Sequence, residues 1–124
     1  MNNDPQAPAD ADAAPAIDHP VLVERTGGDA ELLAEIVALF MAEAPMLFAN
    51  LEAEVDAGRA AGVQATAHRL KGALADLSAV PAARCANDLE QLGRGGTLDG
   101  ARAILDRLRD ELERATAALR GPGP

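Results

Sequence analysis

The sequence contains no tryptophan or tyrosine, and Phe40 and Phe48 are its only aromatic residues. Aromatic side chains stack the bases in single-stranded nucleic-acid sites and line most small-molecule pockets, so both kinds of function are disfavoured. Basic residues are few as well, because ten arginines and one lysine stand against 20 acidic residues, for a net charge of −9. Nucleic acids and anionic lipid surfaces are bound by cationic faces, so we expect no nucleic acid and no membrane as a partner.

Cysteine and long apolar segments are also scarce. Cys85 is the only cysteine, which excludes a disulfide within the chain and a multi-cysteine metal site. The apolar runs fall short of the roughly 20 residues of a membrane span, and the N-terminus lacks the basic start and apolar stretch of a secretory signal. His19 has no set of ligands around it for a metal, and no glycine-rich phosphate loop follows a strand. We therefore predict a cytoplasmic, monomeric protein with no metal, no cofactor and no nucleotide site.

Alanine and leucine dominate what is present, with 29 and 16 residues against nine valines and isoleucines together. This mixture favours helix over strand. Residues 1–16 hold six alanines, three prolines and three aspartates, and are predicted to be a disordered tail. Residues 17–120 are predicted to form one domain, followed by a disordered C-terminus at residues 121–124.

Apolar residues recur at spacings of three and four in four long segments of that domain. A short helix is expected to begin near Ile17. A single kinked helix is then expected from about Ala30 to Ala57, because the apolar stripe stays in phase across Pro45. Asp29 is its predicted N-cap.

Glycine and proline mark the ends of the remaining helices. Gly58 and Gly62 are predicted to bracket the next turn, and Pro81 to open another helix that closes at Gly93, Gly95 and Gly96. Thr97 or Asp99 is predicted to cap the last helix. The pattern predicts an all-α fold, an antiparallel up-down four-helix bundle with a short extra N-terminal helix.

The outward face of the helix after Gly62 is unusual. His68 points away from the buried stripe, and small residues surround it where a solvated helix normally carries charges: Ala61, Ala65, Gly72, Ala75 and Ala79. Arg69 and Lys71, the only lysine, form a local cationic spot in an acidic chain. A neutral imidazole is a competent nucleophile, so reversible phosphorylation of His68 by a bulky donor is the chemistry that this face suits. The alternative is an exposed helical histidine without a role.

Several motifs resemble those of the histidine-containing phosphotransfer (HPt) family. Residues 67–79, AHRLKGALADLSA, are similar to the family signature A-H-x-L-K-G followed by a small, glycine-rich segment. Residues 39–47, LFMAEAPML, resemble the family pattern F-x-x-x-A-P-x-x-L, and Gly27-Gly28-Asp29 and residues 85–90, CANDLE, fit it too. The resemblance covers about residues 17–119.

The resemblance implies that His68 accepts a phosphoryl group from the aspartate of one receiver domain and passes it to another. Lys71 would balance the added charge, and Gly72 would leave room for the receiver. Glu90, 22 residues after the histidine, stands where a polar side chain often holds the imidazole, although it could equally be a solvated helix charge. Arg94 could reach the phosphoryl group or the partner, or be an ordinary surface residue.

The resemblance leaves some questions open. Ser78 departs from the usual glycine, and we expect slightly altered docking with transfer retained. Two other functions remain: a helical adaptor that docks receivers without accepting phosphate, and a module phosphorylated directly by the ATP-binding domain of a histidine kinase.

Overall fold

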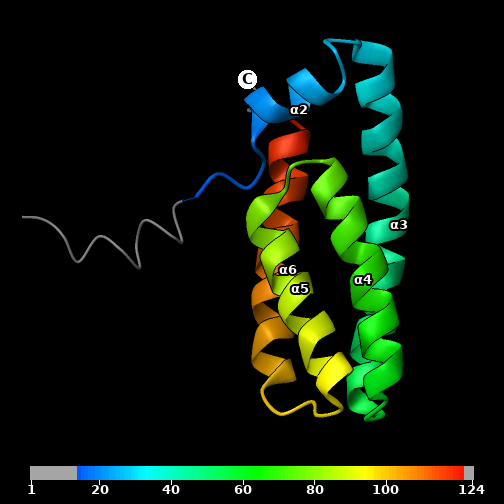
Figure 1. Cartoon of the computed structure of the whole chain (residues 1–124). Helices are drawn as coiled ribbons and strands as arrows, with labels where there is room; N and C mark the ends of the chain where they lie inside the picture. The colour runs from blue at the N-terminus through cyan, green and yellow to red at the C-terminus, as the bar shows by residue number, and fades with distance from the viewer. Residues whose placement is uncertain (1–13, 122–124) are drawn as a thin grey trace, which may run out of the picture.

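The computed structural model describes residues 14–121, and every regular element in that range is a helix. A short helix, α2 (His19–Arg25), precedes four long ones: α3 (Ala30–Asp56), α4 (Ala60–Asp76), α5 (Val80–Gly95) and α6 (Ala101–Leu119). The long helices lie side by side along the molecule, and α2 lies across one end of them (Figure 1). Each packs against the next in sequence, and α3 also meets α6, which closes the ring. The predicted all-α bundle with a short extra N-terminal helix is confirmed.

The long helix α3 continues through Pro45 without a break, as predicted from the phase of its apolar stripe. At its start, the Asp29 carboxylate accepts hydrogen bonds from the backbone N–H groups of Glu31 and Leu32, at 2.9 and 3.0 Å. This satisfies donors that the first helical turn leaves unpaired.

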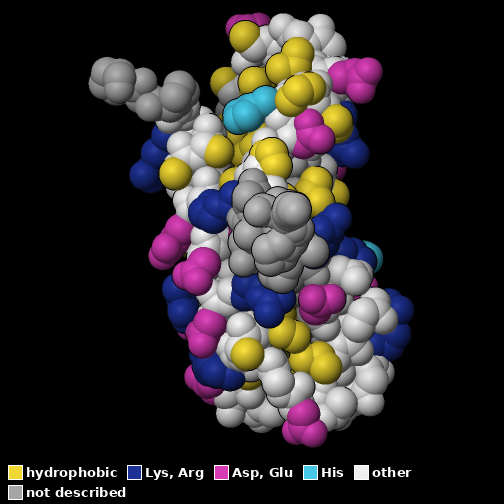
Figure 2. Space-filling model, turned by 90° about the vertical axis from the view of Figure 1, so that its left-hand side faces the viewer, with side chains coloured by type: hydrophobic (Ala, Val, Ile, Leu, Met, Phe, Trp, Pro, Cys, Tyr) yellow, Lys and Arg dark blue, Asp and Glu magenta, His cyan; other side chains and the backbone are white. Residues whose placement is uncertain are grey.

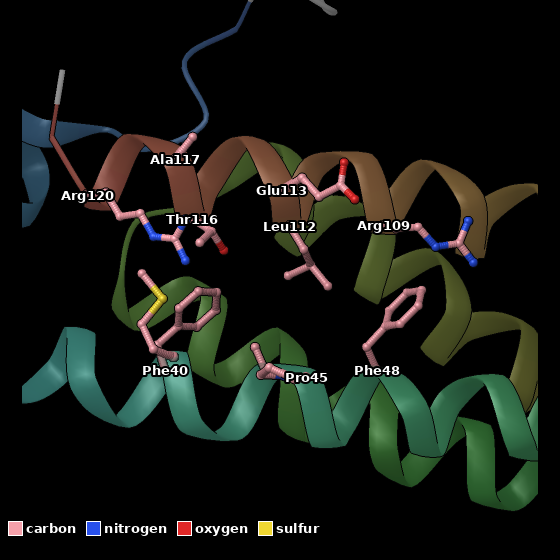
Figure 3. A pocket seen from close by; sticks show the side chains of 11 residues that line it. Phe40, Pro45, Phe48, Arg109, Leu112, Glu113, Thr116, Ala117 and Arg120 are labelled. Atoms are coloured by element: carbon pink, nitrogen blue, oxygen red, sulfur yellow. The ribbon is translucent and has the colours of Figure 1, made fainter. Parts of the chain in front are cut away.

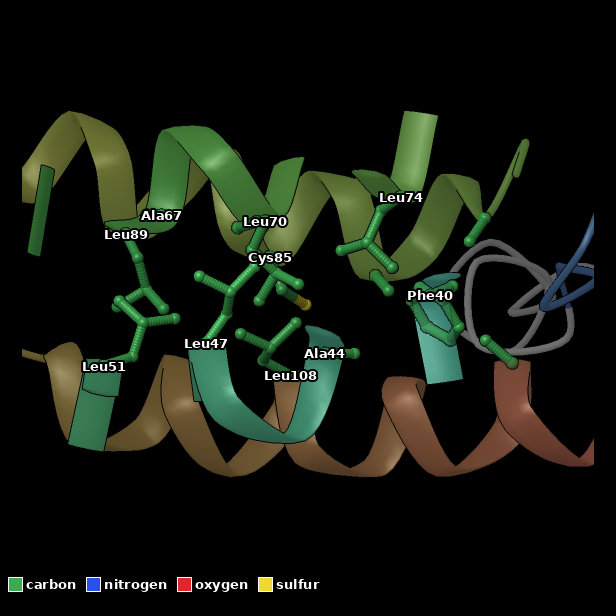
Figure 4. Packing of buried hydrophobic residues seen from close by; sticks show 14 of the residues in the cluster. Phe40, Ala44, Leu47, Leu51, Ala67, Leu70, Leu74, Cys85, Leu89 and Leu108 are labelled. Atoms are coloured by element: carbon green, nitrogen blue, oxygen red, sulfur yellow. The ribbon is translucent and has the colours of Figure 1, made fainter. Parts of the chain in front are cut away.

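The core lies along the axis of the bundle and is made mainly of leucine and alanine (Figure 4). The fully buried side chains come from all four long helices and include Leu51, Leu70, Leu89 and Leu108. Burying one such side chain contributes about 1.5–3 kcal/mol. Cys85, predicted to be a packing residue, is buried in this core, and burial raises the pKa of its thiol.

Three of the predicted boundaries differ from the structure. Gly62 and Gly93 do not end helices but lie inside α4 and α5. Neither Thr97 nor Asp99 caps α6, whose N-cap is Gly100 with a φ of 82°. Instead, the Thr97 hydroxyl accepts a hydrogen bond from the backbone N–H of Asp99, which belongs to the turn before the helix.

The N-terminal boundary also lies earlier than residue 17. The Ala14 carbonyl accepts a hydrogen bond from Arg114 of α6 at 2.6 Å, and Ala16 packs against the core. Residues 1–13 of the predicted tail, and residues 122–124 of the predicted C-terminus, lie outside the described residues.

The segment at the start of the domain is tied to the turn between α4 and α5. The backbone N–H of Asp18 donates to the Ser78 carbonyl at 2.8 Å, and the Arg25 guanidinium donates to the Ala75 carbonyl at 3.0 Å. Ser78 is buried and has a φ of 58°, a left-handed conformation that glycine adopts more easily. Glycine would therefore adopt the backbone conformation of Ser78 with less strain than serine.

Helix α3 carries a longer apolar stretch than predicted. Among the described residues, α3 is a single helix whose length and apolar composition would be sufficient to cross a membrane. Only 17% of its most apolar 18-residue window is buried. Core helices of soluble proteins pass the same test, so this finding alone does not indicate a membrane. It does show that most of this apolar window is not buried in the bundle.

Candidate functional site

His68 lies on α4 with its side chain 68% exposed, and its Nδ1 is 2.9 Å from Oε2 of Glu90 on α5. The Glu90 side chain is 3% exposed. The sequence left the role of Glu90 open between a surface charge and a partner of the imidazole, and the structure places it beside the ring.

Glu90 is contacted by three basic side chains. Besides His68, the ammonium of Lys71 lies 2.6 Å from Oε1, and the guanidinium of Arg94, one turn further along α5, donates to Oε2 at 3.3 Å. The contact with Lys71, and then that with His68, holds the pKa of Glu90 below its ordinary value, although burial acts to raise it. Glu90 is therefore an anion at neutral pH.

The charge of Glu90 determines the tautomer of the neutral imidazole. A carboxylate only accepts hydrogen bonds, so the proton between the two side chains belongs to Nδ1 of His68. The other nitrogen, Nε2, then carries the lone pair. An exposed nitrogen lone pair on an oriented ring is a nucleophile for a large electrophilic partner, as in other sites where a carboxylate orients a histidine.

A close approach of α4 and α5 allows His68 and Glu90 to contact each other. A Cβ on Gly93 would lie 2.6 Å from the carbonyl oxygen of Ala60 and 2.6 Å from the backbone nitrogen of Gln64. Only glycine fits there, because those atoms belong to the helix backbone and cannot rotate away. Gly93 lies one turn after Glu90, and Gln64 one turn before His68, so this close approach of the two helices is next to the site.

Most of the predicted docking face is exposed. Gly72 has open space around the position of a Cβ. Other exposed members of the predicted face are Ala61, Ala65, Arg69 and Ala75. Ala79 is an exception: it is fully buried, because α4 ends at Asp76 and the chain turns inward at Leu77 and Ser78. The prediction that Ala79 faces outward is therefore wrong.

Two features of the site were missed. The side-chain oxygen of Asn87 on α5 accepts a hydrogen bond from Lys71 at 3.2 Å, whereas the resemblance of residues 85–90 to a family motif assigned Asn87 no role. Leu32, Leu39 and Met46 are 40%, 64% and 67% exposed. Their spacing of seven residues, which places them on one side of α3, could have revealed this apolar row.

The apolar row borders the face that carries His68. A Cβ on Gly62 of α4 would lie 2.7 Å from the carboxylate of Glu54, so Glu54 marks the side of α3 that faces α4. At about 100° per residue, Leu39 and Met46 lie within roughly 80° of Glu54 around the helix. The row therefore lies on the outer surface of α3 next to α4.

Two of the grooves on the surface of the bundle bear on the position of the site. One, of about 590 Å³, is bordered by α2, α4 and α5, and Lys71 and Asn87 line it together with Arg25 and Arg84. The other, of similar volume, lies between α3 and α6, where Phe40, Phe48 and Leu112 point into the gap (Figure 3). No residue of the His68 cluster lines the second groove, so it is separate from the site.

Basic and acidic side chains are interspersed over the face of the molecule shown in Figure 2, and hydrophobic side chains gather toward the end that carries α2. Within residues 14–121, no group of three histidine, cysteine or acidic side chains is placed to hold a metal ion.

Comparison with known proteins identifies the family. The family model of the Hpt domain matches residues 35–118, so the chain belongs to the Hpt domain family. Among solved structures, histidine-containing phosphotransfer protein B from Pseudomonas aeruginosa PAO1 is similar, with a TM-score of 0.80 and 25% sequence identity. The similarity covers 86% of this chain and 93% of that one. A search of curated proteins found no match.

Proposed function

We propose that this protein carries a phosphoryl group on Nε2 of His68 and relays it between the aspartates of receiver domains. The observation that carries this proposal is the pairing of an exposed imidazole with a buried carboxylate, His68 Nδ1 to Glu90 Oε2 at 2.9 Å. Membership of the Hpt family and the similarity to a histidine-containing phosphotransfer protein support it.

The bonds formed and broken in the transfer balance between His68 and the donor aspartate. Nε2 of His68 forms a bond to phosphorus as the bond from phosphorus to the donor aspartate breaks, and the electron pair of that bond leaves with the carboxylate. Nδ1 keeps its proton, so the ring becomes cationic, and the nearby Glu90 carboxylate stabilises that charge. In the second transfer the acceptor aspartate attacks phosphorus, and the ring leaves as neutral imidazole.

The docking surface in this proposal extends from His68 over the small residues of α4 to the apolar row on α3. A specific interface covers about 800 Å² on each partner, which corresponds to a disc of roughly 16 Å radius. A partner centred near Gly72 therefore reaches Leu39 and Met46, and covering exposed apolar side chains supplies binding free energy.

Labelling with a phosphorylated receiver tests the assignment. The wild-type protein is expected to acquire a phosphoryl group that is labile in acid and stable in base, and His68→Gln to acquire none while keeping its unfolding temperature. His19→Gln is the matched control, because His19 is the only other histidine and is also exposed. Equal labelling of His68→Gln and wild type would exclude this site.

The same assay separates the alternative functions. Absence of label with any phosphorylated receiver, together with receiver binding, would indicate an adaptor that does not accept phosphate. Label that appears only with the ATP-binding domain of a histidine kinase would indicate a module served directly by a kinase. With ATP alone we expect no label, because the proposed role is that of a carrier.

Gly72→Gln tests the docking face. The site of the Cβ is open, so the variant is expected to fold, but its longer side chain occupies the surface that the receiver needs. Transfer is expected to slow at least tenfold, with no change in the hydrolysis of the phosphohistidine once it has formed. Transfer at the wild-type rate would place the docking surface elsewhere.

A further inference from the structure

Lys71 has two acceptors, and both belong to α5. Its ammonium lies 2.6 Å from the Glu90 carboxylate and donates a hydrogen bond to the Asn87 amide oxygen at 3.2 Å. Before phosphorylation, the positive charge of Lys71 is therefore already balanced by Glu90. If Lys71 served only to neutralise a phosphoryl group on His68, it would need neither of these two acceptors.

Phosphorylation of His68 changes the charge of this cluster. In the resting site, Glu90 contributes one negative charge and Lys71 and Arg94 one positive charge each, with a neutral imidazole, so the net charge is about +1. The phosphoryl group adds about two negative charges and the ring, which keeps the Nδ1 proton, becomes positive. The net charge is then about zero, and the new negative charge lies on the exposed side of the ring.

After phosphorylation, the Glu90 carboxylate and the phosphoryl group on His68 compete for the ammonium of Lys71. Glu90 faces a cationic ring after transfer and also keeps Arg94, so it depends less on the ammonium than before. The phosphoryl oxygens carry the new negative charge and attract the ammonium of Lys71. Lysine carries a compact charge on a flexible side chain, and the side chain of Lys71 is 31% exposed. Its ammonium can therefore move from Glu90 toward the phosphoryl group.

We propose that Asn87 is a positioning residue that holds Lys71 at the boundary of α4 and α5 while the lysine exchanges Glu90 for the phosphoryl group on His68. The proposal rests on the proposed function. A neutral amide suits this role because it holds the ammonium in either state without competing for its charge. A carboxylate at the same place would retain Lys71 on α5.

The experiment compares Asn87→Ala and Asn87→Asp with wild type, and Asp88→Ala serves as the matched control. Asp88 is the exposed neighbour of Asn87 on α5 and lines the same groove. Each protein is phosphorylated, freed from its donor, and followed for loss of phosphate from His68, and its thermal unfolding is recorded.

Asn87→Ala is expected to shorten the phosphohistidine lifetime about fivefold, the factor that the loss of one hydrogen bond produces. Asn87→Asp is expected to unfold at the wild-type temperature or above, since it gains an ion pair with Lys71, and yet to shorten the lifetime by a similar factor. Asp88→Ala is expected to match wild type. A purely structural role of Asn87 would change stability and lifetime together.

A double-mutant cycle completes the test. In a Lys71→Ala background, Asn87→Ala is expected to cause no further change in lifetime, because Asn87 acts through Lys71. An additive effect, or a wild-type lifetime in both single Asn87 variants, would overturn the inference. If wild type itself acquires no label on His68, it is the proposed function that fails, so the two failures are distinguishable.

Discussion

Among the glycines of α4 and α5, Gly72 and Gly93 are expected to respond to replacement by alanine with opposite changes in stability. At Gly72, on the outer side of α4, nothing lies within 4 Å of the position of a Cβ. The replacement therefore gains only helix propensity, about 1 kcal/mol, and the unfolding temperature should rise by about 4 °C.

At Gly93 the same gain is opposed by a clash with the backbone of α4. The added Cβ would meet atoms of Ala60 and Gln64 at 2.6 Å, whereas unstrained contacts of carbon lie near about 3.5 Å, so the helices must separate by roughly 1 Å. Overpacking of this kind costs about 1–3 kcal/mol. Once the propensity gain is subtracted, Gly93→Ala should lose up to about 2 kcal/mol.

The separation of α4 and α5 in Gly93→Ala should also lengthen the contact between His68 and Glu90. The His68 Nδ1 to Glu90 Oε2 distance is 2.9 Å, and an increase of about 1 Å exceeds hydrogen-bond length. Gly93→Ala should therefore lose both stability and phosphoryl acceptance, whereas Gly72→Ala should gain stability and retain acceptance. Thermal unfolding followed by circular dichroism, with the receiver labelling assay, measures both. A Gly93→Ala protein that unfolds at or above the wild-type temperature would refute this reasoning.

Three further predictions follow from the same structure. Because the pKa of Glu90 is lowered in the folded protein, its stabilising effect is present above its ordinary value of 4.5 and is lost as pH falls below 4.5 through the lowered pKa. The stability difference between wild type and Glu90→Gln in urea unfolding should accordingly be larger at pH 7 than at pH 3, and a constant difference would contradict the assigned shift. Ser78→Gly should raise the unfolding temperature by about 4 °C, because a non-glycine residue in the left-handed region costs about 1 kcal/mol; an unchanged or lower temperature would show that this turn is not strained. Leu39→Glu should raise the KM for a phosphorylated receiver about tenfold and leave phosphohistidine hydrolysis unchanged, whereas Ala117→Glu, which lies on α6 beside the other groove, should affect neither; equal effects of the two substitutions would remove the α3 row from the docking surface.

The bundle was predictable because each long helix carries a continuous apolar stripe. The phase of the stripe across Pro45 was enough to favour one helix over two, and the structure has one. Glycine was the less reliable signal. Gly62 and Gly93 suggest helix ends when only the local sequence is considered, but both are helical, and Gly93 exists for the approach of a neighbouring helix, which no local pattern encodes.

The candidate site was predictable in its chemistry and less so in its geometry. The helical period placed His68 outward, because its phase relative to the buried stripe depends only on its own helix. Whether Glu90 reaches the imidazole depends on the distance between α4 and α5 and on the rotation of α5 about its axis. The spacing of residues along the sequence does not determine either quantity. Ala79 was misplaced for a related reason: the helical period was extended past Asp76, where the chain has already left the helix.

The position of α2 affects where the smallest stable fragment of this protein begins. The family match starts at residue 35, inside α3, so a fragment cut there would lack the Asp29 cap and the buried side chains of Ile17 and Leu22. The cap contributes about 1 kcal/mol and the two side chains about 3–6 kcal/mol together, a large part of the roughly 5–15 kcal/mol that holds a domain folded. The autonomous folding unit is therefore longer than the family's shared sequence, and a truncated protein for solution work should retain the chain from Ala14 onward.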